Sequence, residues 1–174
     1  FIGIWMNIDD ILLLVPEKYQ GIQYVFFFIG LAKLFNVSCG ISGGVLLTSN
    51  KYRYDLYINL LLIGLTLFTN MIFIPIYGIE GAALATAISI VIHNLVKWYL
   101  LKKWFGFQPF TYRFLLGVII SLITLFITSL ISFDFEMLIV RIILKSIFIL
   151  FSYSLMIISL RVSPEINKFV FKYL

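Results

Sequence analysis

The chain has 174 residues, of which 62% are hydrophobic and 12% are charged, and its net charge is +5. Soluble domains carry about 45–50% apolar and about 25% charged residues, so this composition excludes an ordinary water-soluble domain and predicts an integral membrane protein. The positive charge does not indicate a nucleic-acid partner, because the basic residues fall at the ends of apolar runs.

Five apolar runs follow one another, each near the ~20 residues that a helix needs to cross a bilayer. They predict an all-α, polytopic transmembrane bundle of about five spans, at residues 23–47, 54–74, 79–101, 114–131 and 138–160. Residues 1–22 are expected to hold the end of a preceding span and an outer surface segment. Residues 161–174 are expected to form an interfacial tail. Because Phe1 opens the chain without a signal-peptide pattern, we expect a C-terminal portion of a longer protein.

A tight turn is expected between the second and third runs. Pro75 lacks a backbone N–H and is expected to end the second run, and Gly78 is expected to permit the reversal. The third run then opens with small side chains, which let helix backbones approach closely inside a membrane. The helix-packing residues predicted here are Gly78, Gly81, Ala82 and Ala85.

The positions of Lys and Arg predict the orientation of the chain. Basic residues cluster after the first run, after the third run and in the tail, whereas the opposite ends carry mostly acids. This alternation suits five spans and predicts a multi-pass protein with a cytoplasmic C terminus. Trp98, Tyr99, Trp104, Tyr52 and Tyr54 are expected at the cytoplasmic interface, where amphipathic rings are common.

Lys33 is the sharpest candidate for a functional residue. It lies about ten residues into the first span, roughly 15 Å deep at ~1.5 Å per residue. A charge at the bilayer centre costs on the order of 3 kcal/mol or more. Lys33 therefore either lines a path for an anionic substrate, or extends to the interface, or pairs with an acid outside this chain.

Weakly polar residues recur at helical spacing along each span, and such faces are expected to meet other helices or a wet cavity. These polar stripes are Lys33, Asn36, Gly40 and Gly44; Asp55, Asn59, Thr66 and Asn70; Ala82, Thr86, Ser89, His93 and Lys97; Gly117, Ser121, Thr124 and Thr128; and Arg141, Lys145, Ser152 and Ser159. His93 is the single histidine. It either forms a hydrogen bond to a neighbouring helix, or it shuttles protons or binds a phosphate. In the fourth and fifth runs we favour plain helix packing by small and hydroxyl residues. The candidates for a substrate cavity are Lys33, Asn36, Asn59, Asn70 and His93.

The sequence lacks the residue sets that enzymes and metal sites need. Cys39 is the single cysteine, so no internal disulfide or Cys-based metal site is expected. Asp9 and Asp10 are expected to be capping acids at a helix start. No nucleophile with a base and no Gly-rich phosphate loop is found. We therefore predict no catalytic residue, no metal, no cofactor and no enzymatic activity.

Residues 56–110 resemble the C-terminal half of polysaccharide flippases, within the superfamily of multidrug/oligosaccharidyl-lipid/polysaccharide exporters. The resemblance lies in Asn59, Asn70, Ile74-Pro75-Ile76-Tyr77-Gly78-Ile79, Gly81-Ala82-Ala83-Leu84-Ala85-Thr86, Asn94, the basic cluster that follows, Gly106 and Pro109. Upstream, it extends to Ile8-Asp9-Asp10 before Pro16, to Gly30-Leu31-Ala32-Lys33, and to Gly40 and Gly43-Gly44. The last two runs resemble the family in hydropathy alone. The Pro-x-x-Gly-x-x-Gly-Ala-Ala block does not separate flippases from drug exporters.

The resemblance implies a transporter of about 12–14 spans in the cytoplasmic (inner) membrane, of which this chain is the C-terminal part. Residues 23–110 would be three spans of its second bundle, and residues 111–160 an accessory helix pair. The implied activity is translocation of an undecaprenyl-diphosphate-linked oligosaccharide, as in lipopolysaccharide O-antigen biosynthesis. The implied partners are that lipid-linked sugar, membrane lipids and the N-terminal half of the transporter.

Two other functions stay open at this point: a cation-coupled multidrug exporter of the same superfamily, and a membrane-embedded glycan polymerase. The exporter is expected to carry intramembrane carboxylates, which the centres of these spans lack. The polymerase is expected to need catalytic acids or a large loop. In the flippase hypothesis, residue chemistry assigns Lys33 to the anionic diphosphate or an acidic sugar. It assigns Asn36, Asn59 and Asn70 to sugar hydroxyls.

Overall fold

The computed structural model describes residues 1–16, 22–40, 42–131, 136–160 and 162. Every regular element among these residues is a helix, which confirms the all-α prediction for this part of the chain. The helices are α1 (Ile2–Trp5), α2 (Ile8–Leu12), α3 (Gln23–Ser38), α4 (Ser42–Leu47), α5 (Tyr52–Phe105), α6 (Tyr112–Leu130) and α7 (Leu138–Ser159). By length and composition, α5, α6 and α7 can each cross a membrane. The expected tail, apart from Val162, lies outside the described residues.

The chain forms two units, one of residues 21–110 and one of residues 1–20 with 111–174. The first contains α3, α4 and α5, and the second contains α1, α2, α6 and α7. The division at residue 110 coincides with the end of the three spans that the sequence assigned to a second bundle. Helices α6 and α7 lie within two residues of the ranges expected for the fourth and fifth spans.

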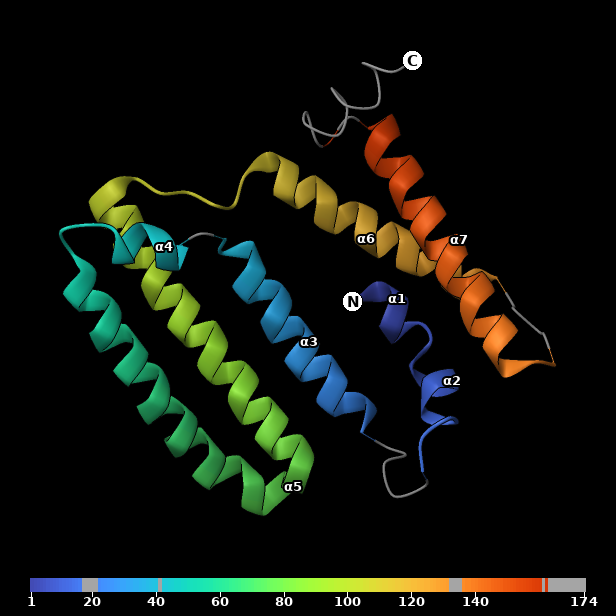
Figure 1. Cartoon of the computed structure of the whole chain (residues 1–174), viewed down its shortest axis with the longest axis horizontal. Coiled ribbons are helices and arrows are strands. Elements are labelled where there is room, and N and C mark those ends of the chain that lie inside the picture. Colours follow the sequence, from blue (N-terminus) through green and yellow to red (C-terminus); the bar gives the residue numbers. More distant parts are fainter. Residues whose placement is uncertain (17–21, 41, 132–135, 161, 163–174) are drawn as a thin grey trace. The chain divides into compact units, whose positions relative to one another are not determined.

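Helix α5 is a hairpin of two helical arms, residues 52–77 and 79–105. Gly78 separates the arms with φ 57° and ψ −129°, a backbone conformation that residues with a side chain rarely adopt. Figure 1 shows α5 folding back on itself at this end of the unit. At ~1.5 Å per residue, each arm is roughly 39 Å long, which exceeds the ~30 Å thickness of the hydrocarbon layer.

The prediction that Pro75 ends the second run is wrong, because the first arm continues through Pro75 to the reversal at Gly78. Proline removes one backbone N–H and its ring crowds the carbonyl one turn earlier. That disturbance falls on the turn before Pro75, and the arm nevertheless keeps helical backbone angles as far as the reversal. The turn is therefore set by the glycine rather than by the proline.

The first predicted span is not one continuous helix. Helix α3 ends at Ser38 and α4 begins at Ser42, so the expected range of 23–47 is divided. Gly40 has a positive φ of 61°, which is the usual way in which a glycine just beyond a helix ends it. Helix α3 alone is shorter than the ~20 residues of a typical span and packs against α5.

Helix α4 and the open end of the hairpin share the apolar core of this unit. Leu46 of α4 and Leu101 of the second arm are fully buried, and Ile58 of the first arm is 4% exposed. The partly buried side chains around this core are Val45, Val96, Leu100, Trp104 and Phe107.

The two arms approach most closely just beyond the turn. A methyl group added at Gly81 would overlap the backbone carbonyl of Phe73 in the first arm. Ala83 and Ala85 are buried, with Ala85 fully so, whereas Ala82 is half-buried. Gly81 and Ala85 are therefore in close contact with the first arm, and position 82 has more room than its place in the small-residue run indicates.

In the second unit, α7 packs against α6, α1 and α2. Thr124 and Thr128 of α6 are buried, and the hydroxyl of each donates to the carbonyl one turn earlier in α6. Asp9 and Asp10 lie in the first turn of α2, where the helix dipole favours acids. Neither caps the helix, because its N-cap residue is Asn7, and Asp10 instead faces α7.

Substitution of Gly81 by Ala tests the close approach of the arms. The added methyl group would push against backbone rather than against a flexible side chain, so we expect a loss of about 1–3 kcal/mol in unfolding free energy. The matched control is Gly64→Ala, because Gly64 has no neighbouring atom within 4 Å of an added methyl. It should gain up to about 1 kcal/mol from helix propensity. Unfolding of both variants in detergent micelles measures the difference, and equal stabilities would contradict the contact.

Candidate functional site: a polar line between the hairpin arms

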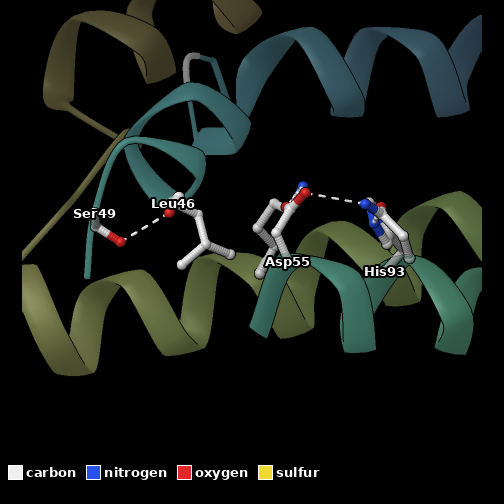
Figure 2. Close-up of polar contacts among 6 residues, drawn as sticks. Leu46, Ser49, Asp55 and His93 are labelled. Atoms are coloured by element: carbon white, nitrogen blue, oxygen red, sulfur yellow. Dashed lines mark hydrogen bonds and ion pairs between the residues drawn. The ribbon is translucent and has the colours of Figure 1, made fainter. Parts of the chain in front are cut away.

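A line of four polar side chains joins the two arms of α5 near the open end of the hairpin. The Lys97 Nζ atom lies 2.9 Å from Asp55 Oδ1. Asn59 Nδ2 donates to Asp55 Oδ2 at 3.0 Å, and His93 Nε2 lies 3.2 Å from Asn59 Oδ1. Figure 2 shows this line running from Asp55 to His93.

The sequence places these residues together through two periodicities. Asp55 and Asn59 are one helical turn apart in the first arm, and His93 and Lys97 are one turn apart in the second. Residues four apart share a face of a helix. The reversal at Gly78 turns the two faces toward each other, so that 55 meets 97 and 59 meets 93.

The ion pair is well shielded, because the side chains of Asp55 and Lys97 are each 9% exposed. Charges inside a membrane segment are costly unless they are paired, and removing one member of a buried pair strands the other. The arrangement thus neutralises two charges that would otherwise oppose insertion of the hairpin. It also fixes the register of the arms at this end.

The hydrogen-bond roles along the line follow from the carboxylate. Ionised Asp55 accepts hydrogen bonds and donates none, so the Asn59 amide presents its NH₂ group to Asp55 and its oxygen to His93. That oxygen in turn requires a proton on His93 Nε2. The remaining ring nitrogen, Nδ1, is then the atom at which His93 gains or loses a proton.

A second polar contact lies farther along the hairpin toward the turn. The hydroxyls of Thr69 and Ser89 are 3.0 Å apart, and Ser89 donates to the carbonyl of Ala85. Thr66 and Thr86, which belong to the polar stripes seen in the sequence, instead donate to carbonyls of their own arm. In the first arm, the hydroxyl that reaches the second arm is therefore that of Thr69, a residue outside the polar stripe.

The remaining sequence candidates lie outside this line. Lys33 and Asn36 are exposed on α3, and within the described residues neither forms an ion pair or a hydrogen bond. Asn70 is half-buried, and its side-chain oxygen has no hydrogen-bond partner in the described part of the chain. The structure thus joins Asn59 to His93, and it separates both from Lys33 and Asn36.

The second unit has an ion cluster of its own. Asp10 of α2 lies 2.6 Å from Arg141 and 3.5 Å from Lys145, both on α7. Asn7 donates to the Ser146 hydroxyl beside it. These contacts attach the first residues of the chain to the fifth predicted span. Arg141 and Lys145 lay on the polar stripe of that span, where packing was the expected role.

Asp55 and Lys97 are the residues that sequence reasoning left out of the site. Both stood in the polar stripes, but neither was among the candidates for the substrate cavity. Residue 55 lies 23 positions before Gly78 and residue 97 lies 19 positions after it, so folding the two runs about the glycine brings these residues to within about one helical turn of the same level. The spacing therefore indicates that the two residues are near each other, but the register that pairs them comes from the structure.

Comparison with known protein families, curated proteins and solved structures gives no match to this chain. Among the described residues, no group of three or more His, Cys, Asp or Glu side chains is placed to hold a metal ion. The polar line itself consists of one carboxylate, one ammonium and one imidazole connected through an amide, groups that can pair charges and exchange protons.

A double-mutant cycle tests the ion pair. Asp55→Asn should cost about 3 kcal/mol or more of unfolding free energy because it strands Lys97, and Lys97→Met should cost a similar amount. The double variant should lose less than the sum of the two, since no unpaired charge remains. Lys103→Met is the matched control: Lys103 is exposed, and its loss should stay within about 0.5 kcal/mol. If the double variant loses as much unfolding free energy as the two single variants together, the ion pair is contradicted.

Proposed function

We propose that this chain is part of a flippase that moves a lipid-linked oligosaccharide, carried on undecaprenyl diphosphate, across the cytoplasmic membrane. Its three long apolar helices are compatible with a membrane protein. Within the residues that resemble polysaccharide flippases, the stretch from Pro75 to Thr86 forms the reversal and the close contact of the hairpin. The hairpin supplies a rigid frame, and α3 lies against it.

The observation that carries the proposal is the exposed polar face of α3. Lys33 and Asn36 are three positions apart and so lie on one face, and both are exposed. A cation on a membrane helix is costly unless it meets water or an anion. A lipid-linked sugar supplies a diphosphate for the ammonium of Lys33, and hydroxyls for the amide of Asn36.

Substitutions at Lys33 test this function. Lys33→Met should abolish export of surface polysaccharide while the protein still inserts, because the charge that attracts the diphosphate is lost. Lys33→Arg should keep part of the activity, since the charge survives although its shape changes. The measurement is complementation of a strain that lacks its flippase, using the full-length gene and quantifying surface polysaccharide.

Lys103→Met is the control for this experiment, because it removes an equal charge from an exposed position at the open end of the hairpin. Export by this variant should match the wild type. Normal surface polysaccharide from Lys33→Met at wild-type protein levels would remove Lys33 from the transport path and contradict the proposal.

Orientation is tested separately. Loops rich in Lys and Arg usually lie on the cytoplasmic side, which predicts that the Gly78 turn faces outward and that Lys103 faces the cytoplasm. With Cys39 replaced by Ser, a cysteine at Glu80 should react with a membrane-impermeant maleimide in intact cells, and a cysteine at Lys103 should not. Reaction at both positions, or at Lys103 alone, would contradict the proposed topology.

A cation-coupled exporter of the same superfamily is the second candidate, and the polar line favours it. Asp55 is a shielded carboxylate inside a helical hairpin, linked through Asn59 to His93. In this function, Asp55→Asn and His93→Gln should abolish the dependence of transport on a pH gradient, whereas Lys33→Met should leave it intact. Transport by the purified protein in vesicles, with and without the gradient, separates the two candidates.

A further inference from the structure

At the open end of the hairpin, three cations lie over aromatic rings. Lys51 Nζ is 5.8 Å from the ring centre of Tyr54 and 5.6 Å from that of Trp104. Lys102 Nζ is 5.2 Å from the ring of Trp98, and the Arg53 guanidinium carbon is 6.0 Å from the ring of Tyr52. We call these seven residues the aromatic–basic belt.

The belt is contributed by both arms and joined across them. The rings of Tyr54 in the first arm and Trp104 in the second are 4.6 Å apart and tilted by 58°. Lys51 therefore lies over a ring pair that exists because the hairpin closes. A cation over an aromatic face is attracted by about 0.5–1 kcal/mol at an exposed site, which restricts long side chains that would otherwise move freely.

The cations of the belt keep their hydrogen-bond donors. A ring face attracts the positive charge as a whole, so the N–H groups of Lys51, Arg53 and Lys102 stay available to oxygen acceptors. All three residues are exposed, and within the described residues none forms a salt bridge. The nearest acid in sequence, Asp55, is already paired with Lys97.

We propose that the aromatic–basic belt is a binding site for the phosphate headgroups of anionic phospholipids. Beside it, the arms of α5 are apolar and long enough to enter the bilayer, and aromatic rings favour the headgroup level. The charge is therefore held at the depth where lipid phosphates lie. This site is independent of the flippase proposal, because it involves neither Lys33 nor the polar line.

Quenching of tryptophan fluorescence by brominated lipids tests the site. In a Trp5→Phe background the two remaining tryptophans, Trp98 and Trp104, both belong to the belt. Vesicles of phosphatidylcholine containing brominated phosphatidylglycerol should quench more strongly than vesicles with brominated phosphatidylcholine at the same fraction. The ratio of the two apparent affinities measures selectivity for the anionic headgroup.

Adjacent lysines provide the matched comparison. Lys102→Gln should reduce the selectivity about five-fold, which corresponds to the attraction of one basic side chain to an anionic membrane surface. Lys103 is exposed and lies over no aromatic ring within the described part of the chain, so Lys103→Gln should reduce selectivity less than about two-fold by general screening. Lys102→Arg should retain the selectivity, because arginine also stacks on aromatic faces; this variant distinguishes loss of the site from loss of folding.

Three results would overturn the proposal. Equal quenching by the two brominated lipids would show that the belt has no headgroup preference. An equal loss of selectivity for Lys102→Gln and Lys103→Gln would indicate a diffuse surface charge rather than a site. Displacement of brominated phosphatidylglycerol by millimolar inorganic phosphate would assign the site to free phosphate instead of lipid.

Discussion

The contacts between residues 52–77 and 79–105 depend on the reversal of the chain at Gly78. Beyond that point the arms must lie within backbone contact, and Gly81 provides the room because it has no side chain to meet the Phe73 carbonyl. A close turn fixes register, and register decides which polar residues meet. Thr69 and Ser89 lie nearer the turn, Asn59 and His93 farther, and Asp55 and Lys97 near the open end.

The polar contacts and the apolar contacts of the hairpin serve different purposes. In a membrane the helices gain little from burying apolar surface, so close packing of small residues and interhelical hydrogen bonds provide the association. The buried ion pair contributes little net stability compared with an apolar pair of equal shape. Its effect is on specificity: a shift of register by one residue would strand Asp55 and Lys97 without partners.

Much of this arrangement was predictable from the sequence. The all-α class, the long apolar helices α6 and α7 and the turn near Gly78 followed from composition, apolar run length and glycine placement. The division of residues 23–47 into two helices and the continuation of the helix through Pro75 could not be predicted in this way. Hydropathy does not report a left-handed residue such as Gly40, nor whether a helix tolerates a proline near its end. Pairing of Asp55 with Lys97 was missed because it depends on register, a tertiary property. Lys33 and Asn36 were placed by sequence on one face, and their role stays a prediction.

The most direct test of the hairpin is a disulfide between its arms. In a Cys39→Ser background, cysteines replacing Thr69 and Ser89, whose hydroxyls are 3.0 Å apart, should form a bond rapidly on mild oxidation in native membranes. The control pairs Ser89→Cys with Leu67→Cys, because Leu67 is 62% exposed and faces away from the second arm; it should react far more slowly. In an unbroken helix, residues 69 and 89 would be about 30 Å apart. Failure of the Thr69–Ser89 pair to cross-link, or equal rates for both pairs, would contradict the account.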